Sequence, residues 1–230
     1  MQGALEDALA KLFGGPVTSV GAGRTDAGVH ALGQVVTVAD APDDIDVVKV
    51  RDSLNGMLAP AIAVSSCAPA APDFHARFSA RSRTYVYAIL EGDVPDPFLA
   101  PTTLFHPEPL DLGAINEAAG HLAGPHDFSS FGRVPVDQSA ERVLYELSAR
   151  RNGRILRIKA RANAFIHQMV RSLVGTLVQV GEGRRSPAET PEVLAARDRA
   201  AAGPVAPPHG LCLVSVEYED DWSRPFDPAK

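Results

Sequence analysis

The sequence predicts an α+β protein in which helices cover one face of a mostly antiparallel sheet. Segments with the apolar spacing of helices are interspersed with pairs of strand-like segments. A strong turn dipeptide, Asn152-Gly153, joins two of these strands and predicts a β-hairpin. A stretch rich in proline and aspartate, 91–101, separates two halves of similar element order, expected at 1–95 and 96–230.

In the first half, the apolar spacing predicts helices at 4–13 and 46–58. The first helix carries its apolar residues on one stripe and ends at Gly14-Gly15-Pro16. The strands expected here are 17–20, 33–38, 61–67 and 77–90.

In the second half, the same reasoning predicts helices at 112–122, 164–180 and 191–202. The hairpin strands are expected at 142–149 and 154–162, and a last strand at 211–218. The two halves suggest an internal duplication, although no sequence repeat is visible.

The composition is that of a soluble globular protein, with 45% apolar and 22% charged residues among 230. No apolar run of about 18 residues predicts a transmembrane helix, and the N-terminus does not resemble a signal peptide. The two cysteines, Cys67 and Cys212, are interpreted as buried thiols rather than a disulfide. We therefore expect a cytoplasmic protein with no membrane partner.

Positive charge is concentrated in one segment, although the whole chain has a net charge of −6. Residues 142–185 contain ten Arg or Lys and two acids, Glu146 and Glu182, so the local excess is eight positive charges. Such a segment is a candidate phosphate-binding surface, because affinity for a nucleic-acid backbone depends on the charge of the contacting face. A solvated basic hairpin is an equally good interpretation.

Asp26 lies between two glycines, Gly23 and Gly28, that permit sharp backbone turns. Its carboxylate would therefore be exposed on a bend between two strands. In an extended segment Arg24 and Asp26 point the same way, so the guanidinium could hold a phosphate beside the carboxylate. Local spacing alone favours the alternative, a turn in which Asp26 hydrogen-bonds its own backbone.

Two further residues are candidates for a substrate site. Tyr85 lies in a strand with several arginines. Such a tyrosine could stack on a nucleic-acid base while the arginines bind its phosphates. A tyrosine buried in the core is an equally good interpretation of the same pattern. Arg171 is the one full charge between Arg161 and Glu182, in an otherwise apolar helix where it would need a carboxylate partner unless it faces solvent. His167 shares a face of that predicted helix with Arg171.

The scattered histidines form no metal-binding motif, and no glycine cluster forms a phosphate loop or a dinucleotide fingerprint. We therefore expect no metal and no cofactor. The segment 127–131 receives no role from its residues alone.

Five segments, in order along the chain, resemble the tRNA pseudouridine synthase A family. They are GRTDAGVHALGQ at 23–34, DFHARFSA at 73–80, RTYVY at 83–87, HDFSSF at 126–131 and NAFIHQMVR at 163–171. One such block could arise by chance, but five in the family's order could hardly do so.

The resemblance implies a pseudouridine synthase fold built from two related halves. It also implies that Asp26 is the catalytic nucleophile, that Tyr85 lies beside the uracil, that Arg171 pairs with the aspartate, and that Arg24 helps to place the target nucleotide. The implied substrate is uridine at positions 38–40 in the anticodon stem-loop of tRNA, and the implied assembly is a homodimer.

Two other functions remain as alternatives. The basic segment 142–185 would also suit a non-catalytic tRNA-binding protein, and the scattered histidines a metal-dependent hydrolase. Family members usually begin with a strand and a loop of the type YDG…GWQ, whereas this chain begins inside the helix that follows them. We expect a misplaced start, with the natural protein longer by that strand and loop, rather than a truncated protein of impaired activity.

Overall fold

The computed structural model describes residues 1–39, 41–42, 44–135 and 138–219. Within these residues the chain forms two compact units, each assembled from separate segments. Of the described residues, the small unit comprises those in Met1–Arg24 and Gln34–Ala80, and the large unit those in Thr25–Gly33 and 81–219. The predicted halves, 1–95 and 96–230, divide the chain elsewhere. The compact units differ from them because the strand at 82–91 pairs within the sheet of the large unit.

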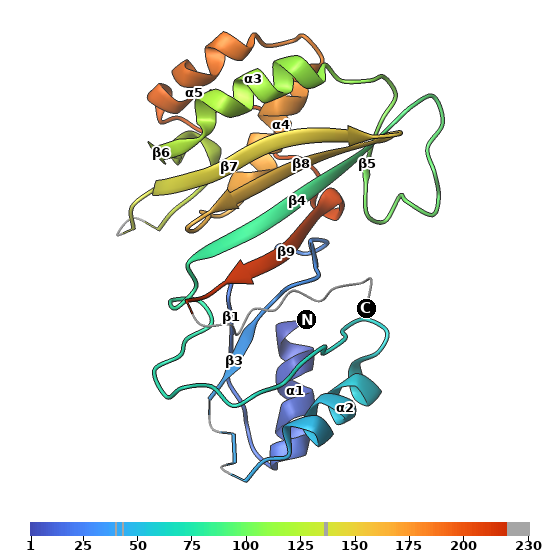
Figure 1. The fold of residues 1–230 in the computed structure, drawn as a ribbon, viewed down its shortest axis with the longest axis vertical. Helices are drawn as coiled ribbons and strands as arrows, with labels where there is room; N and C mark the ends of the chain where they lie inside the picture. The colour runs from blue at the N-terminus through green and yellow to red at the C-terminus, as the bar shows by residue number, and fades with distance from the viewer. Residues whose placement is uncertain (40, 43, 136–137, 220–230) are drawn as a thin grey trace. The chain divides into compact units, whose positions relative to one another are not determined.

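In the small unit, two helices pack around a shared apolar core (Figure 1). Both were predicted, and each has a clear terminus: Gly14 ends the first in a left-handed conformation, and Asp46 caps the second by accepting hydrogen bonds from two backbone N–H groups. The core residues are Ala8, Leu9, Val50 and Leu54. The elements are α1 (Gln2–Phe13), α2 (Val47–Leu58) and the antiparallel pair β1 (Ser19–Gly21) and β3 (Val36–Val38).

The strand predicted at 61–67 was wrong, because these residues have no regular secondary structure. The backbone of Val64, in the middle of this segment, pairs with a side chain instead of a neighbouring strand. The Asn55 amide donates to the Val64 carbonyl oxygen at 2.9 Å, and the Val64 N–H donates to Asn55 Oδ1 at 2.6 Å. One asparagine thus satisfies the donor and acceptor that a strand partner would otherwise take.

The large unit contains a mostly antiparallel sheet with strand order β2-β9-β4-β8-β7-β6, and β5 pairs with β4. Only β2–β9 and β4–β5 are parallel among the described pairs. The predicted fold class is therefore confirmed. The strands are β2 (His30–Ala31), β4 (Ser82–Glu91), β5 (Leu104–His106), β6 (Gly124–Asp127), β7 (Glu141–Asn152), β8 (Ile155–Ala162) and β9 (Leu211–Glu217).

The predicted hairpin is present as β7 and β8, with Asn152 paired to Ile155 and Gly153 and Arg154 forming the turn. Gly153 has a φ of 56°, which favours glycine at this position. The turn is therefore one residue later than the Asn152-Gly153 dipeptide suggested.

Three helices lie together on one face of this sheet (Figure 1), so side chains on alternate positions of β4, such as Tyr87 and Ile89, are fully buried. The helices are α3 (Leu112–Leu122), α4 (Met169–Gly181) and α5 (Thr190–Ala196). Short 3₁₀ turns accompany them: η1 (Ser129–Phe131), η2 (Pro187–Glu189) and η3 (Pro208–Gly210).

Two helix predictions were wrong at their ends. The helix expected from residue 164 begins only at Met169, because Asn163 pairs with the backbone of Val143 and Gln168 has a φ of 64°. The helix expected to reach residue 202 ends at Ala196, since Arg197 adopts a left-handed conformation. Cys67 and Cys212 are free thiols, as predicted, but both are partly exposed rather than buried.

The backbone of Pro204 approaches α4 closely at Gly175. A Cβ atom at this position would overlap the carbonyl oxygen of Pro204, a backbone atom that cannot rotate away. The backbone of residue 203 is held there by a hydrogen bond to Thr176 Oγ1. Glycine is therefore required at position 175, because any side chain there would collide with this backbone.

We expect Gly175→Ala to lower the free energy of unfolding by about 3 kcal/mol, because overpacking at a rigid site displaces backbone. Gly120→Ala is the matched control: Gly120 also lies in a helix, but nothing is within 4 Å of its Cβ position. The control should be neutral or stabilising by up to about 1 kcal/mol. Urea unfolding followed by circular dichroism measures both, and equal stabilities would contradict the prediction.

Candidate active site

Asp26 begins a tight turn in the short segment of the large unit that precedes β2. The Val29 N–H donates to the Asp26 carbonyl oxygen at 3.0 Å, and Gly28 inside the turn has a φ of 87°. A Cβ on Gly28 would lie 3.1 Å from Pro208 Cγ, so both conformation and space favour glycine. A turn is therefore present, but it is closed by the backbone carbonyl of Asp26 and not by the side-chain hydrogen bond expected from local spacing.

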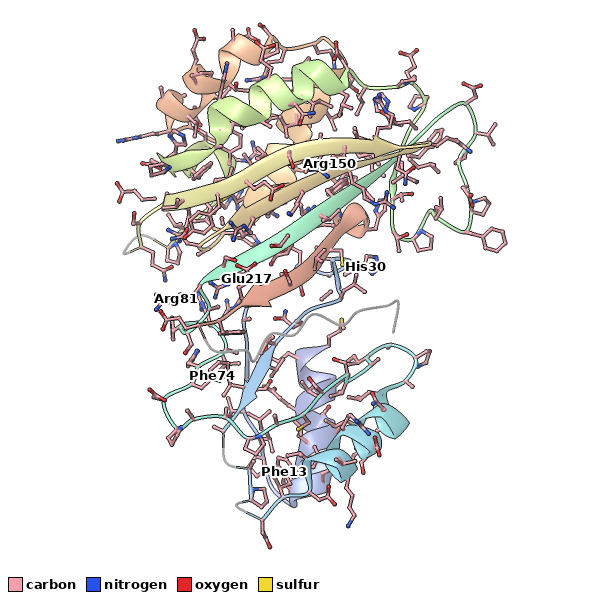
Figure 2. The ribbon with its side chains drawn as sticks, in the orientation of Figure 1. Phe13, His30, Phe74, Arg81, Arg150 and Glu217 are labelled. Atoms are coloured by element: carbon pink, nitrogen blue, oxygen red, sulfur yellow. The ribbon has the colours of Figure 1, made fainter. Side chains whose placement is uncertain are left out.

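Backbone pairing with β9 fixes this segment in place. In β2, His30 and Ala31 pair in parallel with β9, and Figure 2 shows His30 beside that strand. The N–H groups of Leu32 and Gly33 both donate to the Leu213 carbonyl oxygen, at 2.9 and 3.2 Å. A Cβ on Gly33 would overlap the carbonyl oxygen of Val214. The Asp26 turn is thus attached to the sheet within a few residues on its C-terminal side.

Arg171, in the first turn of α4, forms an ion pair with Asp26. Its Nη1 lies 2.5 Å from Asp26 Oδ2, and its Nε donates to the Ala206 carbonyl oxygen at 2.7 Å. The Arg171 side chain is only 13% exposed and that of Asp26 28% exposed. A largely buried carboxylate is costly unless a cation compensates it, and the positive end of the α4 dipole also favours it. The predicted carboxylate partner of Arg171 is therefore Asp26.

His167 contacts the other oxygen of the same carboxylate. Its Nε2 lies 3.2 Å from Asp26 Oδ1, and its side chain is 56% exposed. The four-residue spacing from Arg171 was the signal for this residue, but without the structure it had no assigned role. His167 precedes α4 rather than lying in it, and the left-handed Gln168 separates it from the helix.

Tyr85 lies in β4 and is 7% exposed. Its ring meets that of Phe165 edge to face, with centroids 5.2 Å apart and an interplanar angle of 89°. Burial raises the pKa of Tyr85 to about 12; the charge of Arg83 opposes this shift and that of Asp26 adds to it. The electrostatic effect of Asp26 indicates that the carboxylate and the Tyr85 hydroxyl share one local environment.

Arg24 is the remaining predicted site residue. It ends the first segment of the small unit, and its side chain is exposed. Its contribution to placing a nucleotide stays a prediction.

The basic segment 142–185 is less positive than its sequence suggests. Arg151, Arg161 and Arg171 pair with Glu91, Glu217 and Asp26, which lie outside the segment. Arg150 and Arg157 face each other across β7 and β8 and are exposed; Figure 2 marks Arg150 on β7. These two arginines remain the best candidates in the hairpin for contact with phosphate.

Within the described parts of the chain, no group of three or more histidine, cysteine, aspartate or glutamate side chains is arranged to hold a metal ion. Likewise, none of the helices formed by these residues has the length and apolar character needed to cross a membrane.

Comparison with known proteins gives a consistent result. A family profile described as tRNA pseudouridine synthase matches residues 118–219. The tRNA pseudouridine synthase A of Acidiphilium cryptum (strain JF-5) is 47% identical over 226 residues, which cover 96% of this chain and 88% of that protein. The proteins of the same name from Cereibacter sphaeroides and Gluconobacter oxydans are 44% and 43% identical, covering 96% of this chain and 88% and 82% of their own lengths.

The chain belongs to the tRNA pseudouridine synthase A family.

Membership of the tRNA pseudouridine synthase A family confirms the resemblance inferred from the five sequence blocks. The fold brings residues of three of these blocks together, since Asp26, Tyr85 and Arg171 come from 23–34, 83–87 and 163–171. The profile match to 118–219 includes Arg171 but neither Asp26 nor Tyr85, so two of these three residues lie outside it.

The raised pKa of Tyr85 makes stability depend on pH in the alkaline range. A tyrosine in an unfolded chain titrates near 10, whereas burial holds the pKa of Tyr85 at about 12. The folded state therefore keeps this proton more tightly, so the stabilisation is complete below about pH 10 and is lost as pH rises through about 12.

We expect the free energy of unfolding of the unaltered protein to fall more steeply than that of Tyr85→Phe between about pH 10 and 12. One proton corresponds to a slope of about 1.4 kcal/mol per pH unit. Urea unfolding at a series of alkaline pH values measures this difference. Parallel pH profiles for the two proteins would show that burial does not hold the Tyr85 proton.

Proposed function

We propose that this protein isomerises uridine to pseudouridine in tRNA, with Asp26 as the nucleophile. The observation that carries the proposal is the Asp26–Arg171 ion pair, found in a member of this enzyme family. An ordinary turn aspartate has no need of a nearly buried arginine, whereas a reactive carboxylate in a pocket does.

The proposed reaction breaks the N1–C1′ glycosidic bond, turns the uracil, and joins C5 to C1′. C5 loses a proton and N1 gains one, so the reaction is an isomerisation that requires no oxidant, reductant or added group. For this reason no cofactor enters the proposal. A carboxylate can stabilise or trap the electron-poor C1′, as Asp and Glu do in glycosidases.

The neighbouring residues have separate tasks in this proposal. Arg171 pairs with Asp26 and holds one of its oxygens, Oδ2. Tyr85 offers an aromatic ring against which the extruded uracil can lie, because a base must leave its stack before its glycosidic bond is accessible. Arg24, Arg150 and Arg157 are proposed to bind tRNA phosphates, in keeping with their exposed side chains.

The finer parts of the proposal rest on the family resemblance. We propose that the target uridines are those at positions 38–40 of the anticodon stem-loop, that the enzyme works as a homodimer, and that it works in the cytoplasm. Mapping pseudouridine by sequencing after incubation with unmodified tRNA would identify the positions. Modification confined to other regions of the tRNA would reject the assignment of the stem-loop.

We expect Asp26→Ala to lower the rate of pseudouridine formation by at least about a thousandfold, the scale on which loss of a nucleophile acts, while tRNA binding stays within a few-fold. Asp96→Ala is the matched control. Asp96 Oδ1 accepts a hydrogen bond from the Phe98 N–H at 2.8 Å, so it is a turn aspartate of the ordinary kind.

Full activity of Asp26→Ala would refute the nucleophile assignment. The basic segment 142–185 also suits a tRNA-binding protein without catalysis. Salt-sensitive tRNA binding by the unaltered protein, with no isomerisation, would favour this alternative.

For the homodimer, light scattering after size-exclusion chromatography should give a mass close to twice the 24.3 kDa of one chain. A mass that stays at one chain over a wide range of protein concentrations would contradict the dimer.

A further inference from the structure

His167 and Arg171 hold opposite oxygens of the Asp26 carboxylate. Arg171 Nη1 is 2.5 Å from Oδ2, and His167 Nε2 is 3.2 Å from Oδ1. With one donor alone, the carboxylate can still turn about its Cβ–Cγ bond, a torsion with broad preferences. A second donor on the other oxygen fixes the plane of the group and therefore the direction from which Asp26 meets a substrate.

The contact also defines the protonation of the imidazole at this nitrogen. An ionised carboxylate can only accept hydrogen bonds, so His167 Nε2 must carry the hydrogen for the bond to form. The longer distance and the 56% exposure of His167 make this the weaker of the two bonds. Oδ1 is consequently the oxygen that a substrate can approach, because Oδ2 is held by the nearly buried Arg171.

The backbone of His167 is held by a segment that has no other assigned role. The Arg133 N–H donates to the His167 carbonyl oxygen at 3.2 Å, an isolated antiparallel bridge. A Cβ on Gly132 would lie 2.5 Å from that same oxygen and 2.6 Å from Ile166 Cγ1. The φ of Gly132 is −173°, which any residue can adopt, so glycine is required here for space and not for conformation.

The residues before Gly132 are rigidly placed. Phe128 and Phe131 are fully buried, and the Asp198 N–H donates to Ser130 Oγ at 3.1 Å. Asp127 Oδ1 accepts from the Ser129 N–H at 2.9 Å and from its hydroxyl at 2.5 Å. Residues 127–133, which include most of the HDFSSF block, are therefore fixed by packing and hydrogen bonds and in turn hold the backbone of His167. We call these residues the 127–133 support.

We propose that His167 is a positioning residue that orients the Asp26 carboxylate through Oδ1, and that the 127–133 support holds His167 in place for this task. The proposal deepens the function proposed above and rests on it. In such a role the effect falls on the chemical step, because a small misplacement of a reacting group can lower the rate as much as about a hundredfold.

The kinetic test compares three variants with the unaltered enzyme. His167→Phe keeps a planar ring but has no donor, and we expect kcat to fall by about 10- to 100-fold while KM for tRNA changes by less than about threefold. His167→Gln restores an N–H donor and should recover most of kcat. Gly132→Ala should lower kcat in the same manner, because it displaces the His167 backbone. The control is His121→Phe, at an exposed histidine of α3, which should leave kcat and KM unchanged.

Three kinetic outcomes would overturn the proposal. A rise in KM with kcat unchanged in His167→Phe would make His167 an RNA contact. Unchanged kcat and KM in His167→Phe would mean that His167 has no role in the reaction. Failure of His167→Gln to recover activity would show that the hydrogen-bond donor is not what matters at this position. If Gly132→Ala does not fold, the His167 variants still decide the matter.

A second measurement needs no enzyme activity and so separates this proposal from the proposed function. Nitrogen-15 NMR of the histidine side chains should show His167 with hydrogen on Nε2, and Asp26→Ala should shift its ring-nitrogen signals, whereas Asp96→Ala should not. Unchanged His167 signals in Asp26→Ala would overturn the proposal even if the enzyme forms pseudouridine.

Discussion

The ion pair between Asp26 and Arg171 is the interaction around which the site is built. It joins a turn near the start of the chain to a helix 145 residues later. Arg171 is itself bound to the Ala206 carbonyl oxygen, and the Asp26 segment is bound to β9. The charges are thus held by backbone contacts on both sides, so the carboxylate is ordered before any substrate arrives.

The helices could be predicted because the apolar spacing that marks a helix lies within its own stretch of sequence. The strands β2, β5 and β6 are only two to four residues long and depend on partners that are distant in sequence. For Asp26 and Tyr85, the sequence permits both a structural and a functional interpretation. The structure is compatible with either: Asp26 begins a turn and bears an ion pair, and Tyr85 is buried and lies close to that charge. His167 could be singled out from the sequence but received no role, because the predicted helix began at residue 164 and placed His167 inside it. In the structure His167 lies outside α4 and reaches the carboxylate from there.

Charge counting along the chain was the least reliable guide. The window 142–185 contains few acids of its own, but Glu91 from β4 and Glu217 from β9 pair with Arg151 and Arg161. Because sheet neighbours come from far away in sequence, a local excess of charge overstates what a surface presents to RNA. Arg150 and Arg157, opposite each other on β7 and β8, are the better measure of that surface.

The segment 25–33 belongs to the large unit although the chain on either side of it belongs to the small unit. A gene fragment beginning at residue 81 would therefore encode every described strand of the large sheet except β2, yet it would lack Asp26. Its product would have Arg171 with no carboxylate to pair with, whatever its similarity to the family over 118–219. Dividing the gene at residue 81 would thus separate Asp26 from the unit that contains Arg171. A peptide containing residues 25–33, supplied in trans, would be needed to restore the carboxylate.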